Sequence, residues 1–92
     1  SLDIIPVQRN QGIDAILKEN YQGKPVPIRV QRQGESLHRA LALLHKASQI
    51  KGSLKSILVK TSDDLFDLEL TNIPDHIMII EAPAYTVKKV LS

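Results

Sequence analysis

The sequence predicts an α+β fold in which two helices cover one face of a mixed sheet, and two observations lead to this class. Five short runs of alternating or unbroken apolar residues are typical of strands, and they span residues 2–7, 26–32, 54–61, 65–71 and 76–82. Two segments with apolar residues at helical spacing separate the first three runs. The resulting order β-α-β-α-β-β-β is most simply a two-layer sandwich.

Both predicted helices have one apolar side. The first spans residues 10–21 and places Ile13, Ile16 and Leu17 together at helical spacing. The second spans residues 35–50, and its apolar stripe is wide enough to form the centre of the core. The residues of this stripe are Leu37, Ala40, Leu41, Leu44 and Ala47. We expect the two helices to lie on the same face of the sheet.

The strand between the helices, residues 26–32, alternates between apolar and polar side chains. Successive side chains of a strand point to opposite faces of the sheet. We therefore expect Ile28 and its apolar neighbours to face the helices. This arrangement leaves Arg29 and Gln31 on the open face, where they would contact solvent.

The C-terminal half predicts three further strands. Residues 54–61 and 65–71 flank the polar turn 62–64, which is typical of a β-hairpin. Residues 76–82 are apolar on both faces, which favours a central strand. The last segment, residues 84–92, fits either a terminal helix or a strand.

We expect residues 1–92 to form one small domain, because a chain of 92 residues is the size of a single domain. The hydrophobic fraction of 42% is ordinary for a globular protein. The sequence begins with Ser1 rather than Met, which indicates a domain taken from a longer chain.

Charge is unevenly distributed along the chain, although the net charge is only +2. Residues 1–60 contain ten Lys or Arg and four Asp or Glu, whereas residues 61–92 contain two and six. Glu35 is the single acid between residues 21 and 60. This asymmetry indicates either a charged partner or two halves that neutralise each other within one fold.

The helix predicted over residues 35–50 is the strongest candidate for a binding surface. It is basic after Glu35, and Leu43 and Ile50 widen its apolar stripe beyond what one sheet requires. Alternatively, these two side chains pack on the first predicted helix. We expect a non-catalytic assembly module that contacts an acidic protein surface, either of another protein or of a second copy. The predicted contact residues are Arg29, Arg32, His38, Arg39, Leu43, His45, Lys46 and Ile50.

Two alternative functions remain open. The first is nucleic-acid binding, since phosphate binding requires little more than clustered positive charge. The basic residues close enough in sequence to form such a patch are Arg29, Arg32, Arg39, Lys46, Lys51 and Lys55. The chain has only one Phe, two Tyr and no Trp, which is unfavourable for stacking on single strands. A strand between the two predicted helices excludes a helix–turn–helix motif. The second alternative is an accessory domain of a larger enzyme.

Several kinds of chemistry have no signature in this sequence. The absence of cysteine excludes disulfides and thiolate zinc sites. No nucleophile elbow or phosphate-binding glycine loop occurs, so we expect no catalysis, no cofactor and no small-molecule substrate. His38 and His45 lie seven positions apart, a rise of about 10.5 Å along a helix, which is too far for one ion. His76 has no neighbour at a ligand spacing, so we predict no metal site.

The sequence also gives expectations about location. Its apolar runs are far shorter than the roughly 18–20 residues of a membrane span. Residues 1–7 lack the basic start and long apolar stretch of a signal peptide. We therefore expect no membrane association, and the absence of cysteine slightly favours the cytoplasm.

Overall fold

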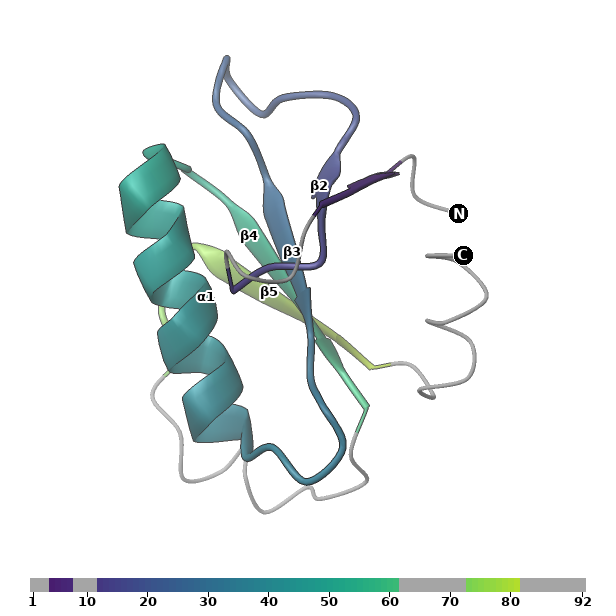
Figure 1. Ribbon diagram of the computed structural model, residues 1–92. Helices are drawn as coiled ribbons and strands as arrows, with labels where there is room; N and C mark the ends of the chain where they lie inside the picture. The colour runs from purple at the N-terminus through teal and green to yellow at the C-terminus, as the bar shows by residue number, and fades with distance from the viewer. Residues whose placement is uncertain (1–3, 8–11, 62–72, 82–92) are drawn as a thin grey trace.

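The computed structural model describes residues 4–7, 12–61 and 73–81, which form one five-stranded sheet with a helix packed on it (Figure 1). The α+β class and the mixed sheet are thereby confirmed. The helix α1 spans Leu37–Lys51. The strands are β1 (Ile4–Pro6), β2 (Ala15–Leu17), β3 (Pro27–Val30), β4 (Ser56–Lys60) and β5 (Ile77–Glu81).

The strands follow one another across the sheet in the order of the chain, β1-β2-β3-β4-β5. The first three are antiparallel, with Ile5 opposite Ile16 and Ala15 opposite Ile28. The last three are parallel, and α1 is the connection between β3 and β4. The carboxyl ends of β3 and β4 therefore lie at the edge of the sheet where α1 begins (Figure 1).

Helix α1 has a clear signal at each end. The Ser36 hydroxyl accepts a hydrogen bond of 3.1 Å from the Arg39 amide, which is a standard N-cap. Gly52 adopts a left-handed conformation with φ 67°, and its amide binds the last carbonyls of the helix. The predicted core stripe is confirmed, because all of its members are buried. These residues are Leu37, Ala40, Leu41, Leu44 and Ala47.

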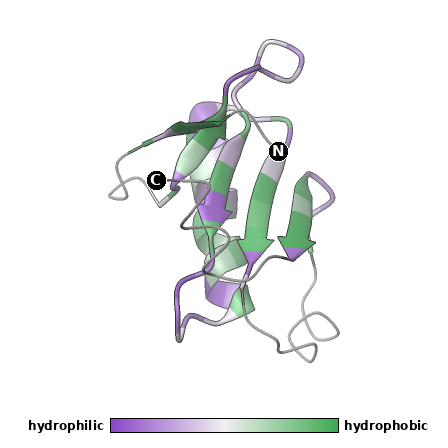
Figure 2. Cartoon of the chain, turned by 90° about the vertical axis from the view of Figure 1, so that its right-hand side faces the viewer, coloured by the Kyte–Doolittle hydropathy of each residue, from purple (hydrophilic) through white to green (hydrophobic). Residues whose placement is uncertain are grey.

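The sheet carries apolar clusters on both of its faces. Leu58 of β4 packs with α1, together with Ile13 and Ile77. Its neighbour Ile57 points the opposite way and packs with Ile28 of β3 in a second cluster. In Figure 2 the described strands are mostly coloured as hydrophobic, as two apolar faces require. The expectation that Ile28 faces the helix is therefore wrong, and the open face is not polar.

The helix predicted over residues 10–21 is also wrong, because Ala15–Leu17 forms strand β2. The backbone of this segment forms hydrogen bonds on both sides, and Val7 N, next to β1, donates to Asp14 O at 3.0 Å. Asp14 N donates to Ile28 O at 2.8 Å, and Leu17 N donates to Val26 O at 3.0 Å. A short segment whose apolar spacing fits a helix also fits a strand, and pairing with β1 and β3 decides between them.

The C-terminal predictions are confirmed in part. The strands predicted over residues 54–61 and 76–82 are present as β4 and β5. Among the described strands β5 is last in the sheet order, so the predicted central position is not seen there. The second hairpin strand, residues 65–71, and the ambiguous segment 84–92 lie outside the described residues.

Candidate functional site

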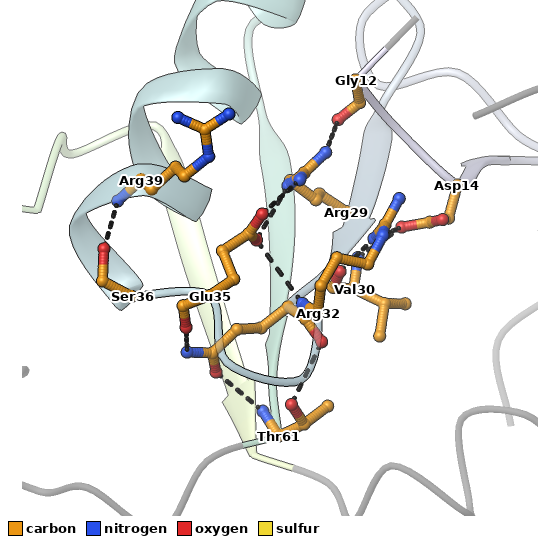
Figure 3. A network of polar contacts seen from close by, with 10 residues as sticks. Gly12, Asp14, Arg29, Val30, Arg32, Glu35, Ser36, Arg39 and Thr61 are labelled. Carbon is orange, nitrogen blue, oxygen red and sulfur yellow. Dashed lines mark hydrogen bonds and ion pairs between the residues drawn. The ribbon is translucent and has the colours of Figure 1, made fainter. Parts of the chain in front are cut away.

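Arg29 lies between the sheet and the start of α1, where it forms a buried ion pair with Glu35 (Figure 3). Its Nη2 is 2.7 Å from Glu35 Oε2, and its Nε is 3.3 Å from Oε1. Its Nη1 donates to the Gly12 carbonyl at 2.6 Å. Only 5% of Arg29 is exposed, so its predicted place on an open face is wrong. The physical reason is that β3 presents to the helix the face opposite to the predicted one, so Ile28 points away from the helix and Arg29 points toward it.

Arg32 is held in a similar way by a carboxylate from a distant part of the sequence. Its Nη1 is 2.6 Å from Asp14 Oδ2, and the same nitrogen donates to the Val30 carbonyl. Asp14 Oδ2 also accepts from the Val30 amide at 2.7 Å. The two arginines thus fasten the β3–α1 loop to residues 12–14 (Figure 3). Their charges are largely compensated inside the molecule.

The carboxyl ends of the parallel strands are joined by further polar contacts. Gln31 is buried, and its side-chain oxygen accepts from the Thr61 amide at 3.1 Å. Its side-chain amide donates to the Glu35 carbonyl at 2.8 Å. Lys60 is also buried, with Nζ 4.0 Å from Glu81 Oε1 on the neighbouring strand. The predicted exposure of Gln31 is therefore wrong. The polar side chains at this edge of the sheet connect β3, β4 and β5 with the β3–α1 loop.

The outer side of α1 presents a different set of residues, which we call the outer stripe: Arg39, Leu43, Lys46 and Ile50. Their spacing of four, three and four residues places them within an arc of about 60° on the helix. Arg39 and Lys46 are exposed, Leu43 is half-buried, and Ile50 is 78% exposed. Helix α1 contains no Asp or Glu. The outer stripe is therefore a basic and apolar surface without internal acids.

His45 lies on another side of α1 and contacts His76, which directly precedes β5. The distance between His45 Nδ1 and His76 Nε2 is 3.3 Å, and the ring centroids are 5.1 Å apart. Burial lowers the pKa of His76 below its ordinary 6.5, and the charges of His45 and Lys55 lower it further, against an opposing effect of Asp75. Local sequence patterns do not reveal this pair, because 31 positions separate the two residues.

The eight predicted contact residues thus fall into three groups. Arg39, Leu43, Lys46 and Ile50 are brought together in the outer stripe. Arg29 and Arg32 belong to internal ion pairs. His38 is exposed but lies about 100° around α1 from Arg39, and His45 is turned toward His76, so neither extends the outer stripe.

Within the described ranges no three or more His, Cys, Asp or Glu side chains are grouped so as to hold a metal ion. The one helix found in those ranges is too short and too polar to cross a membrane.

The chain matches no protein-family model, and no curated protein or solved structure is significantly similar to it.

Proposed function

We propose that this chain is a non-catalytic interaction module that binds an acidic protein surface through the outer stripe of α1. The observation that carries the proposal is the exposure of Ile50, 78%, on the same line of the helix as Arg39 and Lys46. A large apolar side chain beside two cations, with no acid in the helix, is suited to a partner that is both apolar and acidic.

The two kinds of contact would contribute differently. Exposed ion pairs are worth only about 0–1 kcal/mol each, so charge alone would give a weak and salt-sensitive complex. Full burial of an isoleucine side chain contributes about 1.5–3 kcal/mol. Most of the Ile50 surface is still available for burial by a partner. Burial would therefore supply the affinity, and Arg39 and Lys46 would set the orientation and the rate of encounter.

A second copy of this chain is one partner with suitable chemistry. Residues 61–82 contain six Asp or Glu and no Lys or Arg. Two of these acids, Asp75 and Glu81, lie in the described part of the chain, and both are exposed. A contact between different surfaces of two copies would be head-to-tail and would build rings or filaments, whereas a two-fold contact would close as a dimer.

The internal pairing of Arg29 and Arg32 favours a protein partner over a nucleic acid. Phosphate binding depends on the number of cations that can reach the backbone. Two of the predicted phosphate contacts are committed to Glu35 and Asp14. Of the six residues predicted for the phosphate patch, Arg39, Lys46 and Lys55 are exposed, and Lys55 lies beyond α1, so few exposed cations gather in the outer stripe for a nucleic acid.

The test compares the 92-residue chain with the double variant Arg39→Glu/Lys46→Glu. Sedimentation velocity at low and physiological salt measures self-association. Fluorescence anisotropy measures binding of a labelled peptide that contains residues 61–82. Each reversal replaces an attraction of about 0–1 kcal/mol with a repulsion of similar size, so we expect salt-sensitive binding that the double variant weakens about tenfold, which corresponds to 1.4 kcal/mol.

The matched control is Lys18→Glu/Lys24→Glu, which makes the same charge change at exposed positions outside α1. It should leave binding within about twofold of wild type, well inside the tenfold effect of 1.4 kcal/mol. Equal losses in both double variants would show a nonspecific charge effect and contradict the proposal, and no peptide binding or self-association at low salt would exclude a second copy as the partner. Binding of a DNA duplex near 10⁻⁸ M at physiological salt, an affinity typical of specific complexes, would assign the outer stripe to nucleic acid instead.

A further inference from the structure

The pair formed by His45 and His76 is held in place by the core on both sides. His45 follows Leu44, which is fully buried, and His76 precedes Ile77, which is 6% exposed. The His76 carbonyl accepts a hydrogen bond from the Ser56 amide at 2.9 Å, and the Ile77 amide donates to the Pro74 carbonyl at 3.0 Å. The two backbones are therefore fixed relative to each other. Both imidazoles are only partly buried, so water and ions can reach them.

The separation of the two ring nitrogens suits a metal ion. Zn²⁺ binds histidine nitrogen at about 2.0–2.1 Å and prefers tetrahedral geometry. Two nitrogens 3.3 Å apart, each at that bond length, subtend about 104–111° at the ion. The tetrahedral angle lies within this interval. The observed spacing thus corresponds to one edge of a tetrahedral zinc site, and only the ring orientations need to adjust.

We propose that His45 and His76 bind one divalent transition-metal ion of the imidazole-preferring class, Zn²⁺, Ni²⁺ or Cu²⁺. Imidazole ligands favour these ions over Mg²⁺ and Ca²⁺, which prefer oxygen. Among the described residues no third side chain completes the cluster, so water fills the remaining positions. Such a site is exchangeable rather than structural.

The charges around the pair act in opposite directions. Asp75 adjoins His76 in the chain and is exposed, and its negative charge favours a bound cation. Lys55 acts on His76 with the opposite sign. Lys55 also has its ammonium group 5.9 Å from the centre of the Tyr21 ring. The substitution Lys55→Gln should therefore strengthen metal binding, whereas Asp75→Asn should weaken it.

The experiment uses the 92-residue chain, stripped of metal with a chelator and titrated with ZnCl₂ at neutral pH. Histidine side-chain NMR signals report which rings bind. We expect a saturable one-to-one change at His45 and His76, no change at His38, and no response to MgCl₂ at the same concentration. His45→Gln and His76→Gln should each weaken Zn²⁺ binding at least about tenfold, because either change leaves a single imidazole ligand.

His38→Gln is the matched control, since it removes a histidine from the same helix without touching the pair. It should bind Zn²⁺ as the wild type does. Circular dichroism of each variant establishes that the fold is retained, and the wild-type NMR titration gives an answer even if a variant fails to fold. Signals that change equally at all three histidines, or that do not saturate, would overturn the site. An unchanged affinity in a folded His45→Gln or His76→Gln variant would overturn it as well.

Discussion

Removing the negative charge of Glu35 should destabilise the whole fold, because Glu35 compensates a buried guanidinium. The side chains of Arg29 and Glu35 are only 6% and 8% exposed, so solvent screens their interaction weakly. In the variant Glu35→Gln, Arg29 keeps its bond to the Gly12 carbonyl but loses its carboxylate partner. Leaving one member of a buried ion pair without its partner costs about 3–5 kcal/mol.

This loss is large for a protein of this size. At about 0.05–0.15 kcal/mol per residue, a chain of 92 residues has a total stability of roughly 5–14 kcal/mol. Urea unfolding followed by circular dichroism measures the change. With a slope of about 1–3 kcal/mol per molar urea, the midpoint should fall by at least about 1 M.

The matched control is Glu19→Gln, which removes the same charge at an exposed position. It should change the free energy of unfolding by no more than about 0.5 kcal/mol. The double variant Arg29→Met/Glu35→Gln removes the buried charge together with its partner. It should be less destabilised than the two single effects added together, because the residues interact directly. A loss below about 1 kcal/mol in Glu35→Gln, equal to that of Glu19→Gln, would refute the view that the pair is buried and coupled.

Three further predictions concern the core, the end of α1 and the histidine pair. Leu44→Ala should cost about 2–5 kcal/mol in urea unfolding, because Leu44 is fully buried between helix and sheet, and a loss under about 0.5 kcal/mol would contradict the assigned helix face. Gly52→Ala should cost about 1 kcal/mol, since φ is 67° there, and an unchanged or raised stability would contradict a cap that depends on glycine. Burial, followed by the charge of His45, lowers the pKa of His76 below 6.5, so the unfolded chain binds the proton more readily. In buffer with chelator, the stability contribution of His76 is therefore present above pH 6.5 and is lost as the pH falls through the lowered pKa. In His76→Gln the free energy of unfolding should fall less steeply at acidic pH than in the wild type. Identical curves of unfolding free energy against pH would contradict this linkage.

Local periodicity was sufficient to predict α1 and its buried side. The spacing of Leu37, Leu41 and Leu44 identifies a helix face without information from elsewhere in the chain. The strands β4 and β5 are similarly local, since their runs of branched apolar residues have few other interpretations. These elements also build the core on which α1 packs, and the outer stripe lies on the other side of that helix.

The errors arose where distant segments decide the outcome. Alternation shows that Ile28 and Val30 share a face of the sheet. It does not show whether the helix covers that face when both faces of the sheet are apolar. Alternation alone therefore predicts the wrong side for Arg29, whose burial depends on Glu35 and on the Gly12 carbonyl. Likewise, no pattern within a window of the sequence could join His45 to His76.

The agreement between strand order and chain order has a consequence for how the molecule is made. Among the described strands each one pairs with the strand that precedes it, so no strand has to be inserted between two that are already paired. The sheet can therefore grow by addition at an edge. During synthesis the ribosome releases the N-terminal part first, and each described strand then emerges with its partner already outside. The parallel pairs β3–β4 and β4–β5 must wait for longer connections, and α1, whose backbone hydrogen bonds are local, can form within the first of these intervals.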